Sequence, residues 1–396
     1  MSTTERSDGS TALPFTPDEY RGRIAKLCEA LAERSLDAIY VTDPANLYYL
    51  TGYNSFWFDV RNATGVLVRV STQEVTLFDS SDQGARAELC FYDELVLYDA
   101  EPHPHPAGTK AISAHLGQLP GQSRIGIERW SRTPGTPLLE MLAEECGRTV
   151  CFSDASYVVD RLRLYKSAAE VECVRQASAV VDAAYGDLAK IIAPGVTEIE
   201  LAAELNLLMA RHGGEPPALD LSVRSGPHLG LPHFRPTHRR LQPGDLIKVG
   251  TCGVAKRYHV FISRMFSLGE NPEVANLLDR TSHIADAVVA GAALGAPVSH
   301  LKEMTDRLVD DEGLRSLVWW VGGYALGIAF PPDWTGHVFL SEEESVEPAE
   351  LRPGYVTSYE VLMYDPDTPA AYIETLLATC EGVEVLSKVP RTLQVI

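Results

Sequence analysis

The hydrophobic residues of this chain recur with two different spacings, and the spacing changes repeatedly along the sequence. Residues 18–35 follow a helical spacing, with Leu27, Leu31 and Ala32 on one side. Short apolar or alternating runs that are typical of strands follow at residues 38–41, 65–70, 75–78 and 125–127. Strands that alternate with helices predict a small α/β domain, which we place at residues 16–158.

The second half of the chain, residues 159–396, shows one order of elements twice. Two capping boxes, Ser167 with Glu170 and Thr197 with Glu200, each begin a helix. The first helix is expected to end at Pro194-Gly195, and two later helices are expected at residues 273–294 and 299–312. Strands are expected at residues 219–224, 246–249, 258–266, 356–363 and 372–378. A duplication of this kind often places an active site on the sheet between its two halves.

Composition and charge narrow the class of protein. A chain of 396 residues is long enough for two domains, and residues 1–15 are interpreted as a disordered tail without a signal peptide. The net charge of −20 argues against nucleic acid and anionic membranes as partners, and no apolar run is long enough to span a bilayer. Seven cysteines without a CxxC pair indicate a reducing compartment, so we expect a cytoplasmic protein.

Short motifs in a fixed order extend through nearly the whole chain from about residue 16. They are Thr42-Asp-Pro-Ala-Asn46 with Leu50-Thr-Gly-Tyr53, Arg163-Leu-Tyr-Lys-Ser167, Leu241-Gln-Pro-Gly-Asp245 and Leu351-Arg-Pro-Gly354. In order and spacing they resemble the creatinase/methionine aminopeptidase/prolidase superfamily. The resemblance implies a C-terminal pita-bread catalytic domain behind an N-terminal ribonuclease H-like α/β domain, and usually a homodimer.

The chain differs from the metal-dependent members of that superfamily at the metal ligands. Those members bind two divalent ions with two aspartates, one histidine and two glutamates. By motif, the aspartate positions correspond to Gly250 and Phe261, and the histidine position corresponds to Tyr324; only Glu360 and Glu374 remain. Because hard cations need several oxygen or nitrogen ligands at once, we expect no metal and no other cofactor.

Metal-free members of the superfamily, creatinase and ectoine hydrolase, cleave C–N bonds in small nitrogen-rich molecules. Residues 257–264, 325–334 and 382–391 resemble ectoine hydrolase, but the position of Gly250 carries a glutamate there, which argues against ectoine as the substrate. The resemblance therefore implies a metal-independent hydrolase that acts on an amidine, guanidino, lactam or amide bond of a small amino-acid-like metabolite.

Three residues are the candidates for catalysis. His233 precedes Asp245 by twelve residues, where the superfamily has a substrate-facing histidine, and an imidazole can pass a proton to a leaving nitrogen. The alternative is a loop histidine between two prolines. Glu360 and Glu374 lie on adjacent expected strands, where two buried carboxylates would share a proton and act as acid and base or bind a cation. The alternative is a pair of solvent-facing strand residues.

Eight further side chains are candidates for substrate contacts. Tyr324 replaces a ligand histidine, Arg257 and His259 alternate along one strand, and two residues after a Pro-Pro turn would form a pocket wall. Three others lie where creatinase-like N-terminal domains reach over the partner's pocket. The whole set is Tyr324, His259, Arg257, Trp334, Asp333, Phe56, Trp57 and Arg61. Packing is the alternative role for each. Cys252 is expected in a turn after Gly250 and is interpreted as inert.

Two other functions remain open from the sequence. The same pocket could serve a cyclase, lyase or isomerase of specialised metabolism, because a fold does not fix its chemistry. A non-catalytic small-molecule binding protein is the third possibility, against which the histidine and the two glutamates argue.

Overall fold

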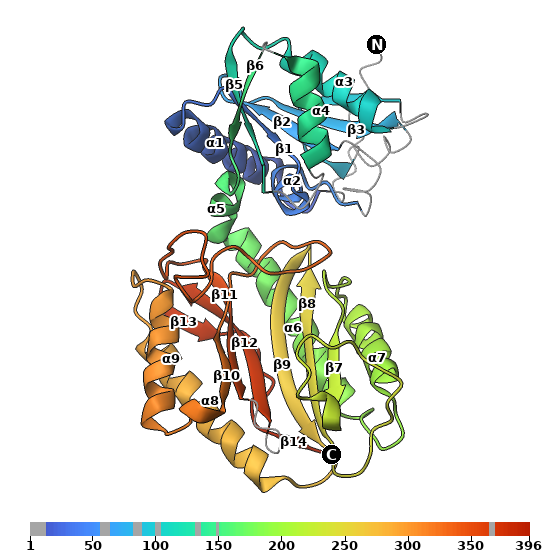
Figure 1. The fold of residues 1–396 in the computed structure, drawn as a ribbon, viewed down its shortest axis with the longest axis vertical. Coiled ribbons are helices and arrows are strands. Elements are labelled where there is room, and N and C mark those ends of the chain that lie inside the picture. Colours follow the sequence, from blue (N-terminus) through green and yellow to red (C-terminus); the bar gives the residue numbers. More distant parts are fainter. Residues whose placement is uncertain are drawn as a thin grey trace. The chain divides into compact units, whose positions relative to one another are not determined.

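The computed structural model describes residues 13–55, 64–81, 89–99, 104–130, 136–147, 150–363 and 369–396. The chain divides into two compact units, Met1–Arg163 and Leu164–Ile396, and each combines a sheet with helices (Figure 1). Phe56, Trp57 and Arg61 lie outside the described residues. Among the described residues, no helix combines the length and the apolar character that crossing a membrane requires.

The N-terminal unit is built on a six-stranded mixed sheet with the strand order β4-β3-β2-β1-β5-β6. Its strands are β1 (Ala38–Val41), β2 (Gly65–Arg69), β3 (Val75–Ser80), β4 (Glu94–Tyr98), β5 (Ser123–Ile127) and β6 (Val150–Asp154). Its helices are α1 (Pro17–Glu33), α2 (Pro44–Thr51), α3 (Pro104–Leu116), α4 (Thr136–Cys146) and α5 (Val158–Leu164), the last of which ends just beyond the unit.

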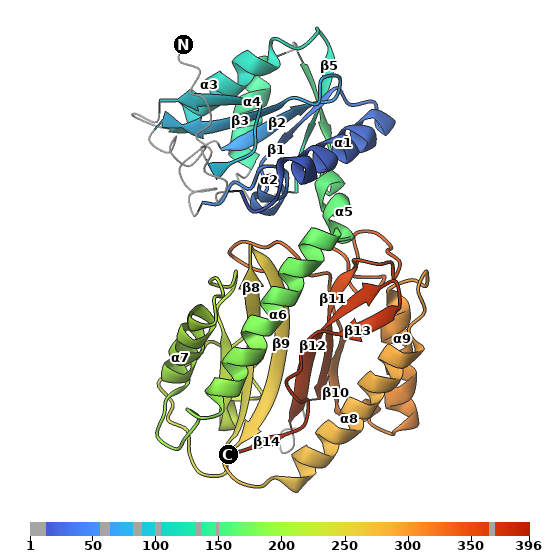
Figure 2. The ribbon, with the colours of Figure 1, turned by 180° about the vertical axis from the view of Figure 1, so that it is seen from behind.

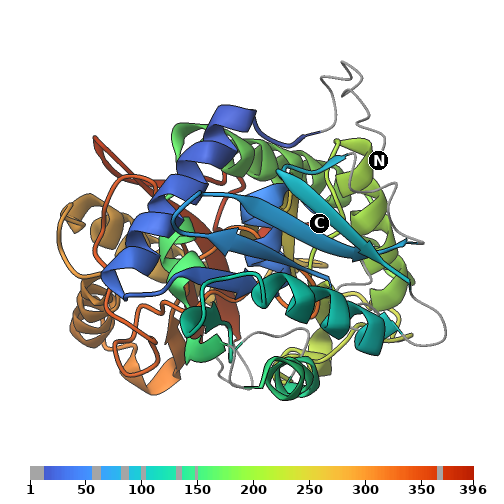
Figure 3. The same ribbon diagram turned by 90° about the horizontal axis from the view of Figure 1, so that it is seen from above.

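Helices cover both faces of this sheet because side chains alternate along its strands. Ala38 and Tyr40 of β1 pack with Ile112 of α3 and Leu142 of α4 in one apolar cluster. The intervening residues of β1 face the other side, and Figure 3 shows the dark blue α1 and the teal α3 on opposite sides of the strands. Tyr53, the last residue of the Leu50-Thr-Gly-Tyr53 motif, is buried and donates to Asp79 over 2.7 Å.

The C-terminal unit is built on an eight-stranded sheet in which β10-β11-β12-β9-β8-β7 are consecutive neighbours, while β13 pairs with β12 and β14 with β9. Its strands are β7 (Ser222–Ser225), β8 (Leu246–Ala255), β9 (Tyr258–Ser267), β10 (Val318–Gly322), β11 (Val356–Met363), β12 (Ala370–Thr379), β13 (Gly382–Val385) and β14 (Gln394–Val395). Its helices are α6 (Ala168–Leu188), α7 (Glu198–Arg211), α8 (Pro272–Gly291) and α9 (Ser299–Asp311).

The expected duplication is visible in this unit. Helices α6 and α7 precede β7–β9, and α8 and α9 precede β10–β12. The two halves meet where β9 pairs with β12, with Ser263 opposite Ile373. Both predicted capping boxes are formed, at Ser167 and at Thr197. Helix α6 packs against β8 and β9 and α8 against β12 and β13, so one face of the sheet is left to other residues (Figure 2).

Two local expectations are wrong, and one strand was not anticipated. Helix α6 ends at Leu188, before Pro194-Gly195, because the chain already turns at Ala189. Strand β8 continues to Ala255, so Cys252 is a buried strand residue and does not lie in a turn. Burial raises the pKa of the Cys252 thiol well above its usual value, which fits the inert role expected of it. Strand β10 was not anticipated, since Val318-Trp-Trp-Val shows neither alternation nor a turn signal.

Candidate active site

A cavity of about 480 Å³ lies on the sheet of the C-terminal unit and is lined by residues of both halves. Two tyrosines mark the face of the sheet that the helices cover, opposite the cavity. The Tyr359 hydroxyl shares a hydrogen bond with the Thr305 hydroxyl of α9, and the Tyr372 hydroxyl donates to the Thr281 carbonyl of α8. Glu360 and Ile373, the next residues along their strands, therefore face the cavity, and both line it.

Strand register explains which residues form the floor of this pocket. Gly250 of β8 lies opposite Ser263 of β9, Ser263 opposite Ile373 of β12, and Ile373 opposite Glu360 of β11. Directly opposed residues share one face of a sheet, and all four line the cavity. The row that crosses the sheet thus contains one carboxylate.

Glu374 does not belong to this row, which corrects the expected carboxylate pair. It lies opposite Tyr359, and its carboxylate accepts a 2.7 Å hydrogen bond from Arg264. Both side chains are almost fully buried, and Arg391 approaches the same carboxylate at 3.7 Å. Because strand side chains alternate, Glu374 takes the helix face, and Ile373 is the β12 residue that faces the pocket.

Glu360 is the buried acid of the pocket. It is 5 % exposed and accepts a 3.0 Å hydrogen bond from the Ser358 hydroxyl. Loss of hydration raises its pKa to about 7, although Ser358, Lys248 and Tyr324 all favour the ionised form. Near neutral pH this carboxyl can therefore either give or take a proton.

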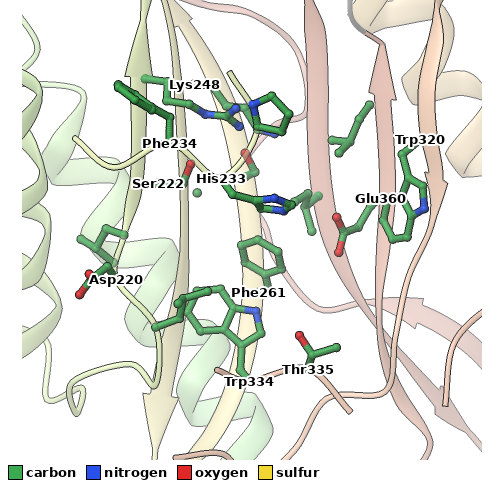
Figure 4. A pocket seen from close by; sticks show the side chains of 18 of the residues that line it. Asp220, Ser222, His233, Phe234, Lys248, Phe261, Trp320, Trp334, Thr335 and Glu360 are labelled. Carbon is green, nitrogen blue, oxygen red and sulfur yellow. The ribbon is translucent and has the colours of Figure 1, made fainter. Parts of the chain in front are cut away.

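His233 approaches the pocket from the loop between the short 3₁₀ turn Gly226–His228 and β8. Its side chain is exposed and lines the cavity, and Figure 4 shows its ring projecting inward with Glu360 entering from the other side. Its backbone has φ 56°, a left-handed conformation that few non-glycine residues adopt.

Aromatic rings form much of the remaining wall. The indole nitrogen of Trp334 donates to the Tyr324 hydroxyl over 3.1 Å, and the Trp334 ring lies 5.0 Å from that of Phe261. Burial holds the pKa of Tyr324 well above its usual value, so its hydroxyl stays protonated. The structure brings Tyr324 and Trp334 to the pocket as expected, together with rings not predicted: Phe234, Trp319, Trp320 and Phe339.

Arg257, His259 and Asp333 are not among the lining residues, contrary to expectation. The His259 ring is fully buried; Nδ1 donates to the Arg257 carbonyl over 2.8 Å, and Nε2 accepts from the Ala218 amide over 3.1 Å. Burial lowers its pKa to about 3, so the ring stays neutral. Arg257 lies in the turn before β9, where its guanidinium binds the Ala329 and Pro216 carbonyls. Asp333 accepts from the Thr335 amide over 2.8 Å.

Two buried cationic residues of the pocket were missed from the sequence. Arg224 of β7 and Lys248 of β8 are buried, line the cavity and lie directly opposite each other. Burial, together with the Arg224 charge, lowers the pKa of Lys248 to about 7 even though Glu360 favours the charged form. Lys248 could have been found from strand alternation, because it precedes Gly250 by two residues and so shares its face.

The residues present do not fit a pair of divalent metal ions. Among the described residues, the floor has Gly250, Phe261 and Ile373 where a metal centre would need carboxylates, and Glu360 is its only carboxylate. Nor do the described residues contain any group of three His, Cys, Asp or Glu side chains that could hold a metal.

This chain belongs to metallopeptidase family M24, whose family model matches residues 172–381, over half of its length. Residues 23–165 match the creatinase/prolidase N-terminal domain. The expected pita-bread superfamily and two-domain α/β fold are thereby confirmed, and the protein is a hydrolase of this family.

Relatives of the chain match it from end to end. Ectoine hydrolase of Halomonas elongata is 26 % identical, over 96 % of this chain and 98 % of the relative. Xaa-Pro dipeptidase of Pyrococcus furiosus is 24 % identical, over 94 % and 99 %. Among solved structures, a dipeptidase from Pyrococcus horikoshii superimposes with a TM-score of 0.81 at 21 % identity, covering 94 % of this chain and all of that one.

Proposed function

We propose that this protein is a metal-independent hydrolase that cleaves a C–N bond in a small, amino-acid-like molecule. The observation that carries the proposal is the pocket floor, where a single carboxylate, Glu360, lies among Gly250, Phe261 and Ile373. The similarity to ectoine hydrolase supports a small nitrogen-containing substrate. The similarity to an Xaa-Pro dipeptidase keeps peptide-like amides among the candidate bonds.

The chemistry of such a pocket follows from proton transfer. Without a metal to lower the pKa of water, the scissile carbon must be activated by a proton on the substrate nitrogen. His233 projects into the cavity and is the group that protonates this nitrogen. Glu360, with a pKa near 7, orients the attacking water or the cationic part of the substrate. Amidines, guanidines and strained lactams accept a proton more readily than ordinary peptides, so they are the preferred bonds.

The partners that we propose with this function are a small-molecule substrate and a second copy of the chain. The proposed location is the cytoplasm. The family resemblance supports the homodimer. The cysteines of the described residues are all free, which agrees with a reducing compartment.

The test is turnover by the purified protein on a panel of small amidines, guanidino acids, lactams and dipeptides, read by mass spectrometry, with and without chelator. We expect hydrolysis of a member of the first three classes, unchanged by chelator, and less than about one-tenth equivalent of Mn, Co, Zn or Fe by elemental analysis, because the donor set is too small. Stoichiometric metal that is lost together with activity would contradict the proposal.

A further inference from the structure

A buried glutamate that the proposed mechanism does not use begins α7. Glu198 is fully buried, and a carboxylate away from water is costly unless hydrogen bonds replace its hydration. The start of the helix does not need this side chain, because Thr197 and Glu200 form the capping box there. The partners of the Glu198 carboxylate lie instead in and beside residues 226–236, which contain His233 and form the His233 loop.

The Glu198 carboxylate binds both ends of the His233 loop. One oxygen accepts from the Ser225 amide over 2.8 Å and from its hydroxyl over 2.7 Å, directly before the loop. The other accepts from the Thr237 amide over 3.0 Å and from its hydroxyl over 2.7 Å, directly after it. Burial by itself would raise the pKa of this carboxyl, but the hydrogen bonds from Thr237, Ser225 and His228 outweigh burial and lower the pKa below its usual value. The carboxylate is therefore ionised near neutral pH, and hydrogen bonds to a charged acceptor are roughly twice as strong as neutral ones.

The same carboxylate is connected to the residue next to His233. Nδ1 of His228 lies 3.1 Å from both carboxylate oxygens and donates to them, and the His228 ring packs on Phe234 with the ring centroids 5.3 Å apart. The side chain of His233 is exposed, and within the described part of the chain it has no hydrogen bond, ion pair or ring contact of its own. The place of its ring therefore depends on the backbone of the loop.

We propose that Glu198 is the positioning residue of His233, and that its carboxylate holds the His233 loop so that the imidazole projects into the cavity, as Figure 4 shows. The inference rests on the proposed function, because it explains how the proposed proton donor is kept in place. Glu198 is not a lining residue, so it acts on the reaction through the loop and does not touch the substrate. Proton transfer needs its two atoms within hydrogen-bond reach, and a displacement of about 1 Å can cost roughly a hundredfold in rate.

Three single substitutions separate the loop contacts from the helix. Glu198→Gln keeps the shape of the side chain, but its NH2 group donates and so cannot accept from the amide at one end of the loop. Thr237→Val removes one hydroxyl contact, leaves Glu198 in place and serves if Glu198→Gln fails to fold. Glu200→Gln is the matched control, because Glu200 lies in the same first turn of α7 and its carboxylate accepts from Thr197, outside the loop.

Hydrogen exchange of the loop tests the inference without a substrate. The amides of Leu229 and Leu231 are hydrogen-bonded to carbonyls within the loop, so their exchange, measured by mass spectrometry, reports how well the loop is held. We expect Glu198→Gln and Thr237→Val to speed this exchange about tenfold or more, because each removes a charge-assisted hydrogen bond, and Glu200→Gln to leave it unchanged. Unchanged exchange in Glu198→Gln, or an equal increase in the control, would overturn the inference.

A double-mutant cycle tests the effect on catalysis. On a substrate that the wild type hydrolyses, Glu198→Gln should lower kcat roughly ten- to hundredfold with little change in KM. In a His233→Ala background the same change should have almost no further effect, because the residue that Glu198 positions is absent. An equal loss in both backgrounds would show a merely structural role and refute the inference.

Failure of the proposed function would give a different result. A wild type that hydrolyses no member of the substrate panel would refute the hydrolase mechanism, while the exchange measurement would still decide whether Glu198 holds the His233 loop. Turnover that does not depend on Glu198, together with unchanged exchange, would refute this inference and leave the hydrolase standing.

Discussion

At the scale of single residues, Glu360 and Lys248 have pKa values that burial moves toward neutrality from opposite directions. Each group lies in an environment that disfavours its charge, and each favours the charge of the other. A pocket with an acid and a base that both titrate near neutral pH is typical of proton-transfer catalysis. The two residues therefore give the sharpest predictions.

The first prediction concerns activity. His233→Ala should lower kcat about a hundredfold or more, because general acid–base groups typically contribute on the order of 10²–10⁴. Glu360→Gln should also lower kcat, and it should remove the rise of rate with pH near 7 that ionisation of this carboxyl produces. The measurement is a pH–rate profile beside a thermal melt. A normal melt with near wild-type turnover in His233→Ala would refute its catalytic role.

The second prediction concerns stability and Lys248. Its folded pKa of about 7 lies below the usual 10.5, so the unfolded chain binds more protons between these values. The stability contributed by this group is therefore lost as the pH falls toward 7 and recovered as the pH rises toward 10.5. Lys248→Met should raise the free energy of unfolding at pH 7.5 and remove that rise. Urea melts of both proteins at pH 7.5 and 9.5 test this. If the free energy of unfolding of Lys248→Met rose between these pH values as much as that of the wild type, the prediction would be refuted.

At the scale of the element, β12 decides the roles of two neighbouring residues. Ile373 faces the pocket and Glu374 faces the helices, although the sequence motif suggested the glutamate for the site. Alternation is strict along a strand, but the strand register that sets its phase depends on the pairing of β12 with β9 and β11.

The third prediction separates the two glutamates. Glu374→Gln should lower the free energy of unfolding by about 3–5 kcal/mol, because it leaves the buried Arg264 charge without its partner. Glu360→Gln should not destabilise the protein at pH 8. Its raised pKa means that folding stability falls as pH rises from about 4.5 to 7, so removing the charge removes that loss. Equal destabilisation by both changes would contradict this assignment.

The fourth prediction concerns Gly250 on β8. An added Cβ would meet Ser263 and Phe261 at ordinary van der Waals distances of 3.4–3.7 Å, and the backbone there is not left-handed. Gly250→Ala should therefore fold with a melting temperature close to the wild type. Gly253→Ala is the contrast, since its Cβ would lie 2.1 Å from the Ala177 carbonyl oxygen, and it should destabilise strongly. Thermal melts of both variants beside the wild type test this, and a large fall in the melting temperature of Gly250→Ala would contradict it.

At the scale of the whole molecule, the family resemblance predicts a homodimer. Light scattering at micromolar concentration should give twice the chain mass of 43.3 kDa. A single species of the chain mass would refute the dimer.

Sequence by itself determined the helices and strands with strong signals. The capping boxes at Ser167 and Thr197 and the two sets of helix, helix, strands depend on local spacing and hydrogen bonding, which are readable from one segment at a time. The resemblance of its motifs to the superfamily also pointed to His233, Tyr324, Trp334 and Glu360, and all four line the cavity.

Only the tertiary structure decided how strands from both halves line up across the sheet. That alignment paired Arg224 with Lys248, turned Glu374 toward Arg264 and closed His259 into the interior. Each outcome depends on register, where a shift of one residue exchanges the two faces of a strand. Register is set by partners far away in the chain, and burial, which moves the pKa values of Glu360 and Lys248, follows from it.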